Sequence, residues 1–407
     1  MVIKNLKKVA DRILKAIRRK EKIILYGDAD LDGVASVIVL KETLKNLNGQ
    51  ISAIYFPNRE SEGYGITENG LNYLKAKLSF MKARRKKKTK FSSPAPHHNY
   101  GGGPALFIAL DCGIGNFKEV KIANKMGFEV IIIDHHEVLD DLPEAKIIVD
   151  PKQKGDEYPF KGLATAGIAF KLSELLLKNK LTETLKQNFL ELVALATIAD
   201  MMPQENENKV MIEEGLISLE NSWRPGLKAF LKINEIKNKI SIRQIAQKII
   251  SALNASNRQD HLSQAFLLLT TSNDGEAEIL AKELLENCYQ KQIRIREITN
   301  EVEEKALKKI SEPIIFEGNS SWPLVLVGPV ASKICHIYKK PTFIFKKGEK
   351  ESRGAVRTPE GKNAVEIMKN CSKFLITYGG HPLAAGFSTK NENLEKFKEC
   401  LICQIKQ

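Results

Sequence analysis

Short apolar runs alternate with helix-like segments between residues 20 and 150. Each run is a block of mainly apolar residues bounded by turn residues, which is typical of a buried strand, whereas the segments between them repeat apolar residues at helical spacing. The alternation predicts βαβ units and a mainly parallel sheet. The runs are KIILYG (22–27), QISAIYFP (50–57), ALFIALD (105–111), VIIID (130–134) and KIIVDP (146–151).

Helical patterns dominate from residue 162 onward, and the segment 276–310 contains neither glycine nor proline, which indicates a long helix. Strand-like runs return after it as PIIF, PLVLVG and PTFIF, before the glycine-rich TYGGHPLAAGFS. The predicted fold class is therefore α/β with two domains. We expect an N-terminal parallel-sheet domain over 1–272, a linker helix over 273–310 and a smaller C-terminal α/β domain over 311–407.

Composition indicates a globular protein whose partners are polyanions. Of the 407 residues, 43% are hydrophobic and 28% are charged, and no run of apolar residues is long enough to span a membrane. The formal net charge of +14 favours nucleic acid, nucleotides or acidic protein as partners, although charge alone does not choose among them. Neither composition nor charge indicates an oligomeric state.

The densest positive run is MKARRKKKTKFSSPAPHHNYGGG (81–103), which holds seven Lys or Arg residues and no acid. Such a composition cannot bury a core, so we expect a mobile basic insertion at the surface. It could contact nucleic acid or be merely solvated.

The six cysteines form no disulfide-type framework in the sequence. We therefore expect a reducing, cytoplasmic compartment. Cys400 and Cys403 form a CxxC within a helical pattern, where two residues on one helical face are a simpler interpretation than a zinc or redox site.

Acids follow several of the predicted strands. Because ligands in open α/β sheets bind beyond the carboxyl ends of the strands, these acids are expected to converge on one crevice. An interpretation in which each acid caps a helix or turn explains the acids singly but not their recurrence at several strand ends. The positions are Asp28, Asp30 and Asp32 after the first run, then Asp111, Asp134 and Asp150, with Asp200 at the end of a helical segment.

The residues around Asp134 add imidazole to this set, because His135 and His136 follow it directly. Carboxylates suit Mg²⁺ and Mn²⁺, whereas histidine is an uncommon ligand of Mg²⁺, so the mixture favours Mn²⁺ with Mg²⁺ as the alternative. There are enough oxygens for two divalent ions with one bridging carboxylate, an arrangement that activates water for attack on phosphorus. Walker and dinucleotide-binding motifs are lacking in the sequence.

Five motifs in order resemble the DHH phosphoesterase superfamily: GDADLDG (27–33), ALDCG (109–113), DHH (134–136), TIADMMP (197–203) and GGHPLAAG (379–386). Four further stretches resemble its RecJ single-strand nuclease branch, in the compact archaeal-type form: PNRESEGYG (57–65), LATAGIAFKL (163–172), LNASNR (253–258) and GPVASKI (328–334). Tyr26 supports this branch, since the oligonucleotide and dinucleotide phosphodiesterases commonly have histidine there.

The resemblance implies a DHH domain followed by a DHH-associated, substrate-binding domain. It implies metal ligands at Asp30, Asp32, Asp111, His135 and Asp200, with Asp28 at or beside the site. His136 would contact the scissile phosphate or orient its neighbour, and with the ligands Asp30, Asp32, Asp111, His135 and Asp200 it would form the catalytic set.

Phosphate-binding chemistry adds candidate substrate contacts. Guanidinium groups offer a planar fork to phosphate, and glycines allow close approach of the backbone, with Pro382 suited to a helix start. The candidates are Arg59, Arg258, Ser332, Lys333, Arg357, Gly379, Gly380 and His381.

The expected activity is a Mn²⁺-dependent exonuclease that acts on single-stranded DNA, RNA or both and releases mononucleotides. Two alternatives stay open: a phosphodiesterase of short oligoribonucleotides or cyclic dinucleotides, and an inactive replication scaffold. The resemblance also makes the replicative GINS complex a candidate partner. The sequence does not indicate polarity along the strand.

Overall fold

The computed structural model describes residues 2–89, 104–138, 141–235, 241–309 and 311–406. The chain forms two compact units, Met1–Cys288 and Tyr289–Gln407, each of which is considered by itself. No helix in these ranges combines the length and the apolar character needed to cross a membrane. The unit boundary falls inside one long helix, so domain limits at 272 and 310 stay predictions.

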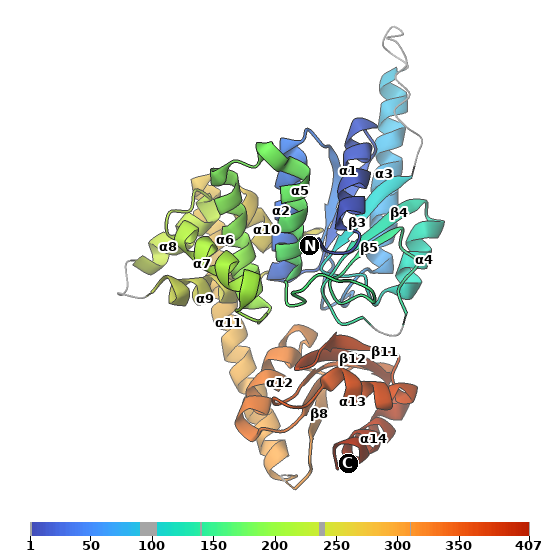
Figure 1. Cartoon of the computed structure of the whole chain (residues 1–407). Coiled ribbons are helices and arrows are strands. Elements are labelled where there is room, and N and C mark those ends of the chain that lie inside the picture. The colour runs from blue at the N-terminus through green and yellow to red at the C-terminus, as the bar shows by residue number, and fades with distance from the viewer. Residues whose placement is uncertain (1, 90–103, 139–140, 236–240, 310, 407) are drawn as a thin grey trace. The chain divides into compact units, whose positions relative to one another are not determined.

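The N-terminal unit is built on a five-stranded sheet in the order β2-β1-β3-β4-β5, in which every neighbouring pair is parallel (Figure 1). The predicted α/β class is therefore confirmed. Its elements are α1 (Leu6–Arg18), β1 (Ile23–Gly27), α2 (Leu31–Asn46), β2 (Ile51–Tyr55), α3 (Glu68–Thr89), β3 (Ala105–Leu110), α4 (Phe117–Lys125), β4 (Phe128–Ile133), β5 (Ile147–Val149), α5 (Thr165–Leu177), α6 (Glu183–Ala199), α7 (Asn206–Glu220), α8 (Pro225–Glu235), α9 (Ile242–Leu253), β6 (Arg258–Gln259), β7 (Leu262–Ser263) and α10 (Gln264–Thr270).

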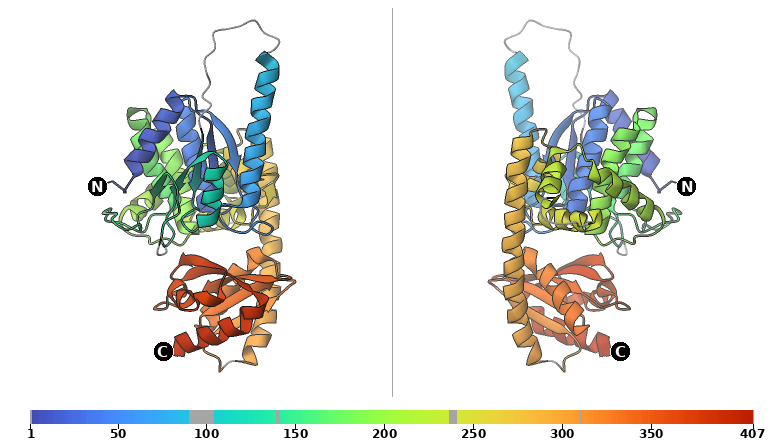
Figure 2. Two further views of the ribbon diagram at one scale, coloured as in Figure 1. Left: turned by 90° about the vertical axis from the view of Figure 1, so that its right-hand side faces the viewer. Right: turned by 90° about the vertical axis from the view of Figure 1, so that its left-hand side faces the viewer.

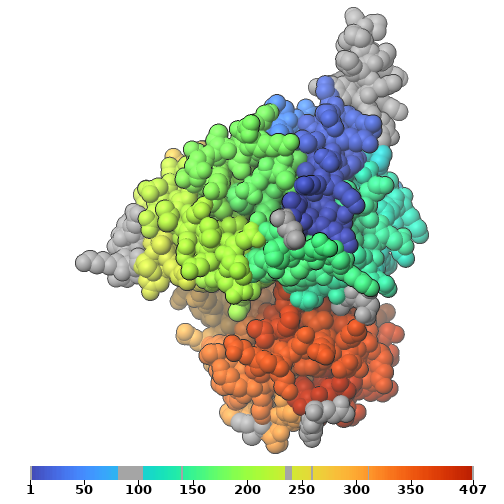
Figure 3. Space-filling model, in the orientation of Figure 1, coloured from blue at the N-terminus to red at the C-terminus, as the bar shows by residue number. Residues whose placement is uncertain are grey.

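Apolar residues on both faces of the strands explain why helices cover the sheet on both sides. Alternate residues of β1 divide between two clusters: Ile23 and Leu25 pack with α1, α2 and α5, whereas Ile24 and Tyr26 pack with α3 and α4. α1 lies at the surface against α5 and β5 (Figure 3). Strands buried on both faces leave only their ends free to carry polar chemistry.

α6 to α10 form a helical layer that packs beside α2. α6 and α7 approach closely at Gly215, where an added Cβ would lie 2.1 Å from the backbone oxygen of Leu190. This packing matters for the site because α6 ends at Asp200, its C-cap residue.

The C-terminal unit has a second five-stranded sheet, in the order β11-β12-β10-β9-β8. β8 pairs parallel to β9, and the other neighbours are antiparallel. α12 packs on one face and α14 on the other, where Phe397 meets Phe343 and Phe387 of the sheet. The elements are β8 (Ile315–Asn319), α12 (Leu324–Tyr338), β9 (Thr342–Lys347), β10 (Glu351–Arg357), α13 (Ala364–Asn370), β11 (Thr377–His381), β12 (Ala384–Lys390) and α14 (Leu394–Lys406).

α11 (Asp274–Leu307) is continuous across the unit boundary (Figure 2). Its first half places Ala277 and Leu284 in the core of the N-terminal unit, and its second half places Ile298 and Val302 in the core of the C-terminal unit. Each unit thus contains one half of this helix.

Three local predictions are wrong. PLVLVG begins α12 rather than a strand, because a short apolar run does not by itself distinguish a strand from a buried helix. Pro382 does not start a helix but follows β11 in a hairpin with β12. Residues 81–89 of the basic insertion continue α3, as Lys, Arg and Ala are good helix formers, whereas residues 90–103 lie outside the described ranges.

The expectation of six unpaired cysteines is wrong for one pair. Cys371 and Cys400 form a disulfide between the end of α13 and α14, with 6.0 Å between their Cα atoms. The pairing depends on how the two helices pack, which the spacing of cysteines along the chain does not reveal.

The contact at Gly215 yields a stability prediction. Gly215→Ala should lower the free energy of unfolding by about 1–3 kcal/mol, because α6 and α7 must separate to admit the methyl group. The control is Gly167→Ala in α5, where the nearest atoms would be 3.5 Å away, so stability should be kept or rise by up to about 1 kcal/mol. Urea unfolding checks both, and equal effects of the two substitutions would contradict the packing account.

Candidate metal centre

The turn from β1 into α2 places three acids within five residues. Asp28 directly follows the strand and is buried, Asp30 is the N-cap of α2, and Asp32 lies in its first turn with a relative exposure of 1%. Asp30 Oδ1 accepts a hydrogen bond from the Gly33 backbone N–H at 3.1 Å. The helix therefore starts where it does because Asp30 caps it, and this start directs Asp32 into the interior.

Asp111 follows β3 in a left-handed backbone conformation, with φ of 62° and a relative exposure of 2%. Non-glycine residues rarely adopt this conformation, and where they do the surrounding structure enforces it, often at functional sites. The backbone N–H of Asp111 remains in register with β4, donating to Ile133 O at 3.0 Å. The strained residue therefore reorients its carboxylate without leaving the sheet edge.

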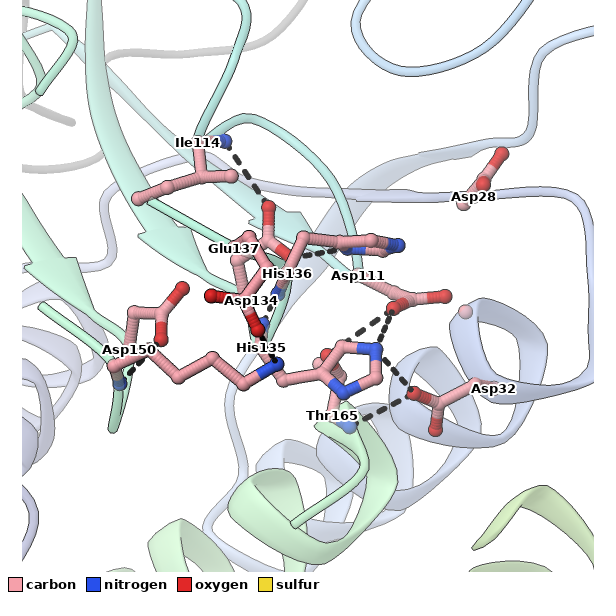
Figure 4. Close-up of polar contacts among 12 residues, drawn as sticks. Asp28, Asp32, Asp111, Ile114, Asp134, His135, His136, Glu137, Asp150 and Thr165 are labelled. Atoms are coloured by element: carbon pink, nitrogen blue, oxygen red, sulfur yellow. Dashed lines mark hydrogen bonds and ion pairs between the residues drawn. The ribbon is translucent and has the colours of Figure 1, made fainter. Parts of the chain in front are cut away.

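Asp134 organises the two histidines that follow it. Its Oδ1 accepts from the His135 backbone N–H at 2.8 Å and pairs with His136 Nδ1 at 2.8 Å, and its Oδ2 accepts from the Ile114 backbone N–H at 3.0 Å (Figure 4). Asp134 was among the acids expected to converge, but it was not among the predicted metal ligands or catalytic residues. Its position within DHH was the only signal of this role.

His135 lies at the centre of the acids and is fully buried. Its Nδ1 is 3.1 Å from the backbone oxygen of Leu163, which can only accept, so Nδ1 carries a proton. Its Nε2 then faces Asp111 at 3.3 Å and Asp32 at 3.6 Å (Figure 4). Asp200 also lies 3.3 Å from this nitrogen. When Nε2 carries no proton, the imidazole held in this way presents a lone pair to the same point as the carboxylates, which is how metal-binding histidines are oriented.

The N-terminus of α5 supplies further partners that the sequence did not predict. Asp32 accepts hydrogen bonds from the backbone N–H groups of Thr165 and Ala166, both at 2.8 Å, and the Thr165 hydroxyl donates to Asp111 at 3.2 Å. A helix N-terminus stabilises negative charge. The segment LATAGIAFKL resembled a family motif, but nothing in its composition identified its N–H groups as partners of Asp32.

The crowded carboxylates disturb one another's protonation. Burial and the charge of Asp30 raise the pKa of Asp32 to about 7, and burial and Asp32 raise the pKa values of Asp111 and Asp200 well above their usual range. Burial lowers the pKa of His136, but Asp134 overcomes this and raises it to about 9. Without a cation, the cluster therefore retains protons that isolated carboxyl groups would release.

Among the described residues of the N-terminal unit, three overlapping triplets have the geometry of metal sites. They are Asp28, Asp30 and Asp111; Asp32, Asp111 and His135; and Asp111, Asp134 and His136, and in each the potential ligand atoms lie within 4.8 Å of one another. Asp111 belongs to all three, but in the third Asp134 is already paired with His136. Oxygen and imidazole donors of this kind fit Mn²⁺ and, less well, Mg²⁺.

The predicted substrate contacts of the N-terminal unit are Arg59 and Arg258. Arg59 reaches the acids directly: its Nη2 lies 2.7 Å from Asp28 Oδ2 and 2.8 Å from Asp30 Oδ2. Arg258 begins the two-residue strand β6, which pairs with β7.

The predicted substrate contacts of the C-terminal unit lie on three elements, β10, α12 and β11. Arg357, at the end of β10, donates from Nε to the Ser332 hydroxyl of α12 at 2.9 Å. Lys333 follows Ser332 and is exposed. Gly379, Gly380 and His381 end β11, and an added Cβ on Gly379 would meet no atom within 4 Å.

The parallel strands end in a centre lined by acids and histidines, and the chain matches two family models. The model described as the DHH family, N-terminal domain, matches residues 22–197, and the model of the DHHA1 domain matches residues 311–407. The chain therefore contains an N-terminal domain of the DHH family and a DHHA1 domain.

The chain is similar to RecJ proteins. It is 33% identical over 404 residues to the single-stranded-DNA-specific exonuclease RecJ of Bacillus subtilis, a match that covers 98% of this chain and 47% of the relative. The chain thus spans about half the length of that protein.

Two solved structures also match. An exonuclease RecJ bound to manganese matches with a TM-score of 0.73 at 25% identity, covering all of this chain and 96% of that one. RecJ from Thermus thermophilus in complex with Mn²⁺ has the same fold, with a TM-score of 0.77 at 24% identity over 100% of this chain and 55% of that one.

The pKa shifts predict how metal-free protein responds to pH. Asp32 and His136 both have raised pKa values, about 7 against 3.8 and about 9 against 6.5, so the folded state holds protons that the unfolded chain releases. Stability in EDTA should therefore fall as pH rises from 5 to about 9. Melting temperatures measured with EDTA and with Mn²⁺ check this. A flat metal-free profile, or one that rises with pH, would contradict it.

Proposed function

We propose that the chain is a divalent-metal-dependent phosphodiesterase, acting as a single-strand-specific exonuclease on DNA, RNA or both and releasing mononucleotides. The observation that carries the proposal is Asp111, whose backbone is left-handed and whose carboxylate is shared by the triplet with Asp28 and Asp30 and the triplet with Asp32 and His135. The similarity to RecJ, a single-stranded-DNA-specific exonuclease, supports this reaction and single-stranded DNA as a substrate. We propose a cytoplasmic location because single-stranded nucleic acid is available there.

Residues of the N-terminal unit would hold the metal. Asp28, Asp30 and Asp111 would bind one ion, while Asp32, Asp111 and His135 would bind a second, with Asp200 beside His135. Two ions, with Mn²⁺ preferred because imidazole is among the donors, would lower the pKa of a bound water and neutralise charge on the phosphate. The chain's contribution is to hold Asp111 between the two positions.

His136 would serve the phosphate rather than the metal. Its Nδ1 pairs with Asp134 Oδ1, which raises the pKa of the ring to about 9 in metal-free protein and favours its protonated form. An imidazolium fixed at Nδ1 presents its Nε2 proton to an anionic oxygen. His136 would thus stabilise charge that develops on the phosphate or the leaving oxygen.

The C-terminal unit would hold the nucleic acid strand. Arg357 and Ser332 are already hydrogen-bonded to each other, so they offer a preformed donor pair to a phosphate. Lys333 adds charge, and the open space at Gly379 would admit a backbone phosphate beside Gly380 and His381. In the N-terminal unit, Arg59 and Arg258 would contact further phosphates.

A cleavage ladder tests the proposal. Wild-type protein with Mn²⁺ should shorten an end-labelled single strand of a few dozen nucleotides progressively and leave the matching duplex intact. Asp111→Ala should reduce the rate at least about a thousandfold, because one residue serves both ion positions. Labels at the 5′ and 3′ ends of DNA and RNA also give polarity and sugar preference.

The same ladder separates the alternatives. Cleavage confined to dinucleotides would favour the small-substrate phosphodiesterase, and wild-type protein that is inert with every divalent metal would favour a scaffold. Association with the GINS complex stays a prediction, which co-purification with purified GINS proteins would test independently of hydrolysis.

A further inference from the structure

Arg59 occupies a position that a metal ion would share. Its guanidinium contacts Asp28 and Asp30 with Nη2 and lies 3.4 Å from Asp28 Oδ1 with Nε. With Asp111, these two acids form one of the candidate metal triplets. The guanidinium is therefore the counter-ion of that triplet in metal-free protein.

Arg59 and a divalent ion would compete for the carboxylate of Asp30. Asp30 Oδ1 accepts from the Gly33 backbone N–H as the cap of α2, whereas Oδ2 pairs with Arg59. The cap leaves Oδ2 as the oxygen that no backbone group engages, and a cation bound at either oxygen of this carboxylate would lie close to the guanidinium. Two positive groups at one carboxylate repel each other, so binding of one weakens binding of the other.

The segment that carries Arg59 is anchored at its far end, at residues 65–67. The Tyr26 hydroxyl donates to Gly65 O at 3.1 Å and accepts from the Thr67 backbone N–H at 3.1 Å. Asn116 Oδ1 accepts from the Ile66 backbone N–H at 3.0 Å. Because these contacts anchor the segment that follows β2, a change at Arg59 can be confined to its side chain.

Tyr64 provides a second contact for the Arg59 guanidinium, which can persist when the guanidinium moves away from the acids. The Arg59 guanidinium carbon lies 4.6 Å from the centre of the Tyr64 ring, and the tyrosine is 60% exposed. A cation over an aromatic face keeps a favourable contact without a carboxylate. The guanidinium can therefore turn from the acids toward solvent without losing all of its partners.

We propose that Arg59 is a built-in competitor of the metal ion at Asp28 and Asp30, and that metal binding frees its guanidinium for a substrate phosphate. The second half rests on the proposed nuclease function, whereas the first half does not. Taken together, the two halves mean that metal binding and substrate binding strengthen each other. If bound metal raises the affinity for a substrate phosphate by some factor, then a phosphate bound to Arg59 raises the affinity for the metal by that same factor.

The competition should be visible when Mn²⁺ is titrated into EDTA-stripped full-length protein by calorimetry. Arg59→Ala should bind its first Mn²⁺ about tenfold more tightly than wild type, a gain of about 1.4 kcal/mol. Arg59→Lys keeps the charge but loses the planar fork, so its Kd should lie between the two. A Kd for Arg59→Ala that equals or exceeds that of wild type would overturn the proposal, whatever the Kd of Arg59→Lys.

Arg12 provides the matched control. It also bridges two carboxylates, with Nη2 2.6 Å from Glu21 and Nε 2.7 Å from Glu129, but those acids lie at the amino ends of β1 and β4. Arg12→Ala should leave the Mn²⁺ Kd unchanged. An equal gain in this variant would mean that general charge reduction, not competition at Asp30, causes the effect, and would refute the proposal.

A second titration, with a non-cleavable phosphorothioate decamer of thymidine present, reads the coupling. The decamer should tighten Mn²⁺ binding more in wild type than in Arg59→Ala, since only wild type gains from release of the guanidinium. Equal tightening in both would refute the coupling. Because the first titration contains no substrate, a failure to cleave single strands would overturn the proposed function and leave the competition measurable.

Discussion

Repulsion among carboxylates packed at one edge of a parallel sheet is the constraint on which the rest of this structure depends. Asp32 and Asp111 are almost fully buried, and both lie within reach of His135 Nε2. Burial penalises their charge, and their mutual repulsion adds to that cost. The fold offsets part of the cost with α5 N–H groups at Asp32 and with Arg59 at Asp28 and Asp30, and a cation would offset the remainder.

The arrangement of helices follows from this constraint. α2 and α5 both begin at the site, so their N-termini direct backbone N–H groups and partial positive charge toward the acids. α6 reaches the site with its other end and delivers Asp200, which is why its close packing on α7 at Gly215 affects the centre. The proposed catalytic geometry is thus a property of the whole N-terminal unit rather than of one loop.

The sequence predicted the parts of the site that depend on topology. Acids after β1, β3 and β4 were expected to meet because parallel strands end at the same edge, and the structure brings Asp30, Asp111 and His135 into one cluster. The partners from α5 were missed because backbone N–H groups carry no residue-type signal. PLVLVG was assigned as a strand because its helical burial pattern depends on the sheet that α12 covers. The Cys371–Cys400 disulfide likewise depends on tertiary packing.

The central claim is that the crowded acids form a site for two cations with Asp111 between them. Anomalous scattering from a crystal of the full chain grown with Mn²⁺ tests it most directly. We expect two peaks, one bounded by Asp28, Asp30 and Asp111 and the other by Asp32, Asp111 and His135. Well-ordered density for Asp111 without a peak on either side of it, at a Mn²⁺ concentration that supports hydrolysis, would contradict the account.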